Sequence, residues 1–347
     1  MSAMVLDFSA PGLVCALGFS AAAACAALRS GVANFSELRY WDKNRLPVIG
    51  ATVQGVSADL QFGPRLIEIL TIALRDSLAG MPHQRTERVP LLLGMAEPER
   101  PGSASDWSAS MIARVQERLG VGFHPKLSRV LPLGHTAGFE ALGVARGLLQ
   151  STDIPGCIVC GVDSYINASA LFWLDRHWRL KRENHTDGLI PGEAAASGYV
   201  QRRTHAAAGR RVDVVGLGFA HEDAPALSEK PLLALGLAAA GRHAMLEAGW
   251  GFHDVEFRLS DLTGENYGFR ELALVEGRLA SVVRRQPQPL WHPADSLGDT
   301  GAAAGLVQLV WASEAWARGY APGARAACFT SAIAGGRAVT LLRSREA

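Results

Sequence analysis

The sequence predicts an α/β fold organised around a buried sheet. Two observations support this prediction. Short apolar runs typical of strands alternate with helical segments along the whole chain of 347 residues. In addition, 48% of the residues are hydrophobic and 19% are charged, a composition that is normal for a globular core and argues against disorder. A chain of this length forms one large domain or two smaller ones.

The first part of the chain supplies helices and strands in alternation. An alanine-rich segment predicts a helix over residues 20–30, which Gly31 ends. Apolar residues at helical spacing predict a second helix over residues 64–78, and an amphipathic pattern closed by Gly120 predicts a third over residues 105–119. Continuous apolar runs predict strands over residues 4–7, 89–94 and 154–162.

The second part of the chain continues the same alternation. Helical patterns cover residues 231–248 and 300–318. Apolar runs predict strands over residues 212–219, 255–262, 326–330 and 338–342. The two parts of the chain show the same alternation of strands and helices, which fits an internal duplication, although their sequences share little similarity.

The segment around residue 135 has the pattern of a nucleophile elbow. An apolar strand passes through Gly134 and the polar residue His135 into a helix of small residues. Such an elbow is a sharp strand-to-helix turn that lifts one side chain to the N-terminus of a buried helix. The helix carries apolar side chains at near-helical spacing, namely Ala137, Ala141, Ala145 and Leu148. His135 therefore stands where a nucleophile is expected.

This elbow resembles that of the condensing enzymes of the thiolase and β-ketoacyl synthase superfamily. In those enzymes the elbow reads roughly Ala-Cys-Ser-Ala-Gly, and this chain has Gly-His-Thr-Ala-Gly from Gly134 to Gly138. The segment from Asp187 to Ala196 is similar to the family's Asp-Gly-Phe-x-x-Gly-Glu-Gly-Ala-Ala. Further similar segments follow in the family's order and run from Gly12 to Gly31, from Gly161 to Ser164, from Leu297 to Gly305 and from Ile333 to Gly336.

The resemblance implies a thiolase-like five-layer α/β/α/β/α sandwich made of two similar halves. Residues 1–200 would form the N-terminal half, which holds the elbow, and residues 201–347 the C-terminal half. Ketosynthases of this superfamily are usually homodimers, and the resemblance places their interface on the strand that follows the elbow helix. A homodimer or heterodimer through the strand from Cys157 to Val162 is therefore expected.

The three catalytic positions of a ketosynthase, one cysteine and two histidines, are changed in this chain. The resemblance places His135 at the nucleophile position and Thr263 and Asp299 at the two histidine positions. Thr263 can donate one hydrogen bond, but an ionised Asp299 only accepts and would repel a developing enolate. The helix N-terminus favours the neutral form of His135. Decarboxylative condensation is therefore not expected. The predicted substrate pocket consists of Glu265, Asn266, Ala334 and Gly335.

Two functions from different classes remain open. In the first, the chain is a catalytically degenerate ketosynthase-like protein that acts by binding. It would be a partner subunit similar to chain length factors, or an adaptor of the kind found beside type VI secretion effectors. In the second, it is an acyl hydrolase or acyltransferase that uses His135, oriented by Asp299, on thioesters of coenzyme A or an acyl carrier protein. The expected partner is accordingly an acyl carrier protein or a secretion effector.

Composition and motifs argue against several other classes. The net charge of +1 without a basic stripe argues against nucleic-acid binding. No segment approaches the ~20 apolar residues of a membrane span, and no signal-peptide pattern occurs, so a cytoplasmic location is expected. Strand alternation puts the thiols of Cys157 and Cys160 on opposite faces, which favours core packing over a metal or redox pair. No cofactor and no metal are expected.

Three aromatic residues lie between the strand after the elbow helix and the segment that begins at Asp187. Phe172, Trp173 and Trp178 either close a substrate tunnel or belong to a dimer core. The sequence favours the dimer core.

Overall fold

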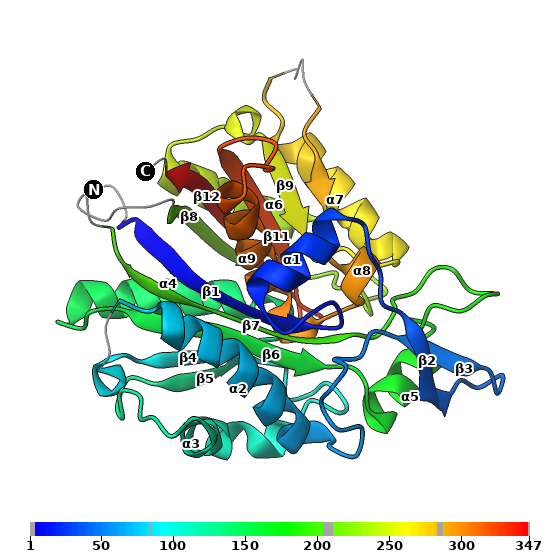
Figure 1. Cartoon of the computed structure of the whole chain (residues 1–347). Helices are drawn as coiled ribbons and strands as arrows, with labels where there is room; N and C mark the ends of the chain where they lie inside the picture. Colours follow the sequence, from blue (N-terminus) through cyan, green and yellow to red (C-terminus); the bar gives the residue numbers. More distant parts are fainter. Residues whose placement is uncertain (1–3, 83–84, 204–210, 283–286, 346–347) are drawn as a thin grey trace.

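The structure is a computed structural model that describes residues 4–82, 85–203, 211–282 and 287–345 (Figure 1). Its strands are β1 (Leu6–Cys15), β2 (Ser36–Trp41), β3 (Pro47–Gly50), β4 (Leu91–Met95), β5 (Arg129–Pro132), β6 (Cys157–Ser164), β7 (Glu193–Arg202), β8 (Arg211–His221), β9 (Phe257–Ser260), β10 (Leu290–Trp291), β11 (Arg325–Ser331) and β12 (Gly336–Arg345). Its α-helices are α1 (Ala21–Arg29), α2 (Phe62–Gly80), α3 (Ser108–Leu119), α4 (Ala137–Ser151), α5 (Ala168–Arg176), α6 (Leu235–Ala248), α7 (Asn266–Leu279), α8 (Ala294–Leu297) and α9 (Ala304–Ala317).

Ten of the strands form one mixed sheet with the order β10-β9-β11-β12-β8-β1-β7-β6-β4-β5. The order repeats itself. In each half of the sheet the five strands, counted along the chain, lie in the order third, second, fourth, fifth, first. The two first strands, β1 and β8, pair antiparallel at the centre, where Phe8 faces Val212. The two halves of the chain therefore build the same half-sheet twice, while the residue boundary between them stays a prediction.

The helices and the two half-sheets lie in five layers (Figure 1). Helices α2 and α3 cover the outer face of the first half-sheet, and α6 and α7 cover the outer face of the second. Helices α4 and α9 form the middle layer, since each of them contacts strands of both half-sheets and α4 contacts α9. The elbow helix α4 is thus packed between two sheets, as a buried helix after an elbow should be.

Separate apolar cores lie between these layers. The central core gathers side chains from α4, α9 and the inner faces of the sheet, and one outer core lies beneath each pair of outer helices. Cys157 belongs to the central core and Cys160 to the outer core under α2. Their predicted placement on opposite faces of one strand is confirmed. Burial raises the pKa of the Cys157 thiol to about 12, so this side chain packs as a neutral apolar group.

Strand β1 is much longer than the predicted strand over residues 4–7. Pro11 and Gly12 are residues that interrupt strands, and they end the predicted segment. In the structure the register of β1 against β7 shifts between Ser9 and Gly12, and Ala10 has a φ of 50°. This bulge takes up the proline, and the strand then continues to Cys15.

The expected dimer strand is not available for pairing with another subunit, which corrects the prediction. The residues from Cys157 to Val162 belong to β6, and β6 pairs with β4 on one side and with β7 on the other. Every residue of β6 is buried within its own chain. The sequence analysis misplaced the interface because an apolar run reveals burial but not whether its partners come from the same chain.

Candidate functional site

The elbow is present and brings its polar residue to a buried position. After β5 the chain turns at Gly134, whose φ is +59°, and enters the short 3-10 helix η3 (Gly134–Thr136) that leads into α4. A matching 3-10 helix, η5 (Gly301–Ala303), leads into α9, and η3 and η5 contact each other. The repeated turn therefore places His135 beside Asp299, 164 positions away in the sequence.

His135 and Asp299 form a buried ion pair. The His135 Nε2 donates to the Asp299 Oδ1 at 2.8 Å, and the same oxygen accepts the backbone N–H of Gly301 at 2.8 Å. Burial by itself would lower the pKa of His135, but the charge and hydrogen bond of Asp299 outweigh it and raise the pKa to about 9. Burial opposes ionisation of Asp299 as well, yet its pKa is lowered by His135. The expected neutral imidazole is therefore wrong, because a carboxylate in contact outweighs a helix N-terminus.

A second carboxylate, missed in the sequence analysis, belongs to this site. Asp261 follows the C-terminal end of β9 and lines the same cavity as His135 and Asp299. Burial raises the pKa of Asp261 to about 6, although the charge of His135 and the backbone N–H of Ser331 both lower it. The sequence signal was its place directly after a buried strand, two residues before Thr263.

Thr263 and Glu265 line the cavity, but their side chains bind each other and Arg179. The Thr263 hydroxyl donates to the Glu265 Oε2 at 3.3 Å. Glu265 in turn accepts two hydrogen bonds from Arg179, from Nε at 2.6 Å and from Nη2 at 2.7 Å. A bidentate arginine–carboxylate pair is among the stronger polar contacts, so Glu265 is engaged by Arg179 and Thr263 by Glu265, although both line the cavity of His135. Arg179 was also missed, since it reaches the site from the chain that follows α5.

The cavity beside the pair is small. Its volume is about 60 Å³, whereas ligand pockets usually measure about 300–1,000 Å³. Arg337 closes one wall, since its guanidinium donates to the Glu271 Oε1 at 2.7 Å and to the Tyr267 hydroxyl at 2.8 Å. Polar groups that bind one another therefore surround the pair.

Three of the four predicted pocket residues do not line this cavity. Asn266 is exposed and binds the carboxylate of Asp187 through its backbone and side-chain N–H groups at 2.8 and 2.9 Å. Ala334 is exposed, and Gly335 is buried in the turn beside His221. Of the predicted pocket, the structure brings only Glu265 to His135 and Asp299.

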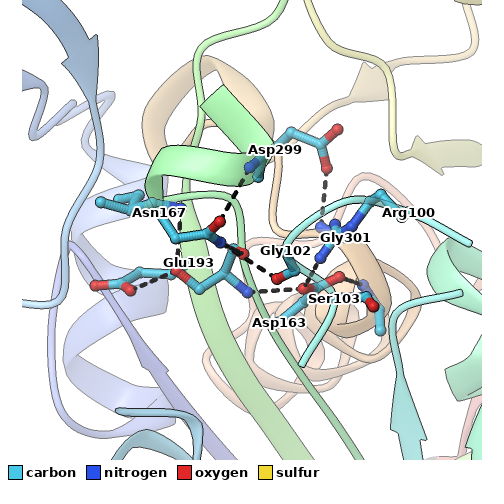
Figure 2. A network of polar contacts seen from close by, with 12 residues as sticks. Arg100, Gly102, Ser103, Asp163, Asn167, Glu193, Asp299 and Gly301 are labelled. Carbon is cyan, nitrogen blue, oxygen red and sulfur yellow. Dashed lines mark hydrogen bonds and ion pairs between the residues drawn. The ribbon is translucent and has the colours of Figure 1, made fainter. Parts of the chain in front are cut away.

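A buried network behind the site holds η5 in place (Figure 2). The Asp163 Oδ2 accepts the backbone N–H of Ala302 at 2.9 Å, which ties the end of β6 to η5. The Asp163 Oδ1 accepts the Nη2 of Arg100 at 2.5 Å and the backbone N–H of Ser164 at 2.8 Å. This carboxylate therefore positions the turn that carries Asp299 and Gly301.

Gly134 offers a test of how tightly the elbow is packed. A Cβ at this position would lie 2.2 Å from the carboxylate of Glu97, and the positive φ also disfavours any other residue. We expect Gly134→Ala to destabilise the protein by about 1–3 kcal/mol in urea unfolding. Gly147→Ala in the same α4 is the control, since a Cβ there meets nothing, and it should stabilise by about 1 kcal/mol. Equal effects of both changes would contradict this packing.

Comparison with known proteins finds solved structures of similar fold. No protein-family model and no curated protein sequence matches the chain. The fold is similar to that of a chain in the complex of the ketosynthase ApeO with its chain length factor ApeC from Xenorhabdus doucetiae, at 15% identity and a TM-score of 0.75, covering 99% of this chain and 98% of that one. A β-ketoacyl synthase from Burkholderia phymatum matches at 17% identity and 0.75, covering 99% and 100%. The oxazolomycin ketosynthase domain OzmH KS7 from Streptomyces albus matches at 14% identity and 0.81, covering 98% and 75%.

These likenesses confirm the predicted thiolase-like fold. At such low identity they concern the fold alone. None of the helices in the described ranges is both long and apolar enough to cross a membrane.

Proposed function

We propose that this chain is a non-catalytic partner subunit, similar in role to a chain length factor, that acts by binding a ketosynthase-fold protein. The observation that carries the proposal is the state of the nucleophile position. It holds a buried imidazolium that is paired with Asp299. One of the similar structures is itself a ketosynthase bound to a chain length factor.

The ion pair argues against acyl transfer through His135. Because the pair with Asp299 raises its pKa to about 9, the imidazole is mostly protonated at pH 7, and only the neutral form is a nucleophile. Its Nε2 is occupied by Asp299, and its Nδ1 is buried without a partner among the described residues. All five cysteines are buried, and none is among the described residues that line the cavity. The hydrolase or acyltransferase alternative is therefore not favoured.

The free edge of the sheet offers a place for a partner subunit. In the described part of the chain, β5 pairs with β4 alone and ends the sheet beside the elbow. Val130 and Leu131 in β5 are half-buried, and Leu133 directly after it is exposed. An unpaired edge with apolar side chains pairs readily with a strand of another chain. This edge replaces the strand from Cys157 to Val162 as the proposed contact.

Thioester chemistry tests the non-catalytic part of the proposal. The intact protein is incubated with acetyl, malonyl and long-chain acyl thioesters of coenzyme A, and its mass and the free thiol released are followed. We expect no acyl adduct and no release above the uncatalysed rate. An adduct on His135, or turnover that His135→Ala abolishes while the fold is kept, would establish the acyltransferase alternative instead.

Partner isolation tests the binding part. The tagged chain is recovered from its own cells, and a matched variant carries Val130→Lys and Leu131→Lys on the edge strand. Recovery of a ketosynthase with the wild type but not with the variant is expected. Recovery of secretion effectors in its place would identify an adaptor, and self-association alone would contradict a partner subunit.

A further inference from the structure

One end of the molecule carries a lobe that contributes only Arg179 to the lining of the site. It consists of the hairpin β2–β3, helix α5 and the chain that follows α5 to Ile190, and we call it the hairpin–α5 lobe. Figure 1 shows β2, β3 and α5 side by side, away from the layered body. Three contacts join its parts. The backbone N–H of Lys43 donates to the Asp175 Oδ2 at 3.0 Å, and Arg182 is paired with both Asp42 and Asp175.

The hairpin–α5 lobe has a core of its own. Leu38 and Val48 of the hairpin pack with Leu171 and Leu174 of α5. The same cluster includes Leu180 and Leu189 from the chain that follows. The lobe is therefore a preformed surface whose backbone needs no ordering when a partner binds.

The lobe leaves large aromatic side chains in solvent. Trp41 and Phe172 are each 68% exposed, and Trp178 is 58% exposed. Outside the lobe every tryptophan is buried or half-buried, and Trp311 and Trp316 are only 8% and 7% exposed. Phe172 and Trp178 face outward, so they do not close a tunnel within the single chain, and the expected dimer core stays a prediction. Trp173 is half-buried against the core of the lobe. Exposed aromatic side chains on a rigid surface are typical centres of protein–protein contacts.

The charges of the lobe are unbalanced. Its two inner carboxylates, Asp42 and Asp175, are both used by Arg182. The exposed carboxylates that remain are Glu37, Glu183 and Asp187, and Asp187 binds Asn266. The exposed cations are more numerous and comprise Arg39, Lys43, Arg45, Arg176 and Lys181. Over residues 36–50 and 168–190 the seven cations outnumber the five carboxylates by two, so the lobe has a net charge of +2, whereas the whole chain has +1.

A cavity beside the hairpin is large enough to receive a side chain from a partner. Its volume is about 350 Å³, against about 60 Å³ at the His135 site. Strand β2 forms one wall, and Leu38, Val53 and Ile166 make part of the lining apolar. Arg65 also lines it, but its guanidinium is bound to Glu193 and to backbone oxygens. Glu37, Arg39, Thr52 and Gln54 line it as well, so the lining is mixed. Its apolar part can contact the anchor residue of an interface.

We propose that the hairpin–α5 lobe binds an acidic face of another protein, which seats an apolar side chain in the cavity beside β2. An acidic partner is favoured because its charge complements the net positive charge of the lobe. A second copy in a symmetric contact would bring two positive lobes together, which disfavours it. This inference rests on the proposed function, because it assigns a second surface, besides the β5 edge, through which the chain would bind a partner.

The chain has only four lysines, which makes the contact easy to map. Lys43 and Lys181 lie in the lobe, and Lys126 and Lys230 are exposed outside it. A carbodiimide joins a lysine amine directly to a carboxylate, so a link at one of these four lysines identifies a carboxylate of the neighbour at that place. The full chain is treated with carbodiimide in its own cell extract after nuclease digestion, and the linked peptides are identified. We expect carboxylates of one co-purified protein on Lys43 or Lys181.

A matched pair of variants completes the test. Trp41→Ser combined with Phe172→Ser should lower recovery of that protein at least tenfold, while Leu246→Ser, which removes an 84% exposed apolar side chain elsewhere, should leave it unchanged. Raising the salt from 0.05 to 0.5 M should weaken recovery as well. Thermal unfolding of both variants should match the wild type, because the altered side chains are exposed.

Other outcomes separate this inference from the proposed function. If links formed only through Lys126 or Lys230, or if both variants recovered the partner equally, the lobe would not be the contact surface. The proposal that the chain is a partner subunit would still stand. Links only between copies of the chain, or recovery that nuclease abolishes, would overturn the acidic protein as its occupant. Recovery of no partner at all would contradict the proposed function itself.

Discussion

Replacing Glu193 by glutamine is expected to destabilise the protein by about 3–5 kcal/mol, because it leaves a buried arginine without its counter-charge. Glu193 is fully buried, and its carboxylate accepts the Nε of Arg65 at 2.7 Å, the backbone N–H of Val53 at 2.8 Å and the hydroxyl of Ser164 at 2.9 Å. Glutamine keeps the shape but turns one acceptor into a donor that faces the guanidinium. The sequence analysis had not paired Glu193 with any charged residue.

Urea unfolding at neutral pH measures this cost. Glu68→Gln is the matched control, since Glu68 forms a similar pair with Arg118 at the surface, with Nε to Oε1 at 2.7 Å and side chains 29% and 50% exposed. An exposed pair is worth only about 0–1 kcal/mol. If Glu193→Gln were as mild as Glu68→Gln, the buried pair would not be essential to this fold.

Raising the pH from about 6.5 to above 9 is expected to remove about 3 kcal/mol of stability through His135 alone. The folded protein holds its pKa at about 9, above the ordinary 6.5, because the pair with Asp299 stabilises the charged form. Stabilisation from a raised pKa is complete below the unfolded value and is lost as the pH rises through the folded one. The difference of about 2.5 units corresponds to about 3 kcal/mol.

The measurement compares the wild type with His135→Gln in urea at several pH values across this window. Glutamine can donate a hydrogen bond to Asp299 but does not titrate. The variant should be less stable at pH 6.5, and the difference from the wild type should shrink as the pH approaches 9.5. Titrating groups remote from His135 contribute equally to both proteins and cancel in the difference, whereas Asp261 and Asp299, whose pKa values His135 lowers, do not. A difference that does not change with pH would show that His135 is neutral in the folded state.

The elements with local signals were predictable from the sequence. Gly134 and the small residues after it specify the elbow without help from the rest of the chain. The pairing of His135 with Asp299 required the two halves to come together, and only the family resemblance suggested it. The charge of His135 was predicted wrongly, because periodicity and composition do not reveal which carboxylate touches which imidazole. Asp261 and Arg179 were missed for the same reason.

The order of the strands was the other part that sequence could not supply. The runs that became β5 and β6 are both apolar, and nothing in either reveals which one ends the sheet. Only pairing on both sides identifies β6 as internal. We therefore propose β5 in place of β6 as the interface strand. The four residues of β5 are too few to give a clear strand pattern in the sequence.

The middle layer has a consequence for how this chain folds. Because α4 and α9 each pack against both half-sheets, neither half can bury its own apolar surface without the other. A truncation between β7 and β8 would expose the inner face of one sheet and one side of a helix, which invites aggregation. The duplicated halves are therefore not autonomous modules. We expect them to melt in a single cooperative transition, so the duplication is one of architecture and not of folding units.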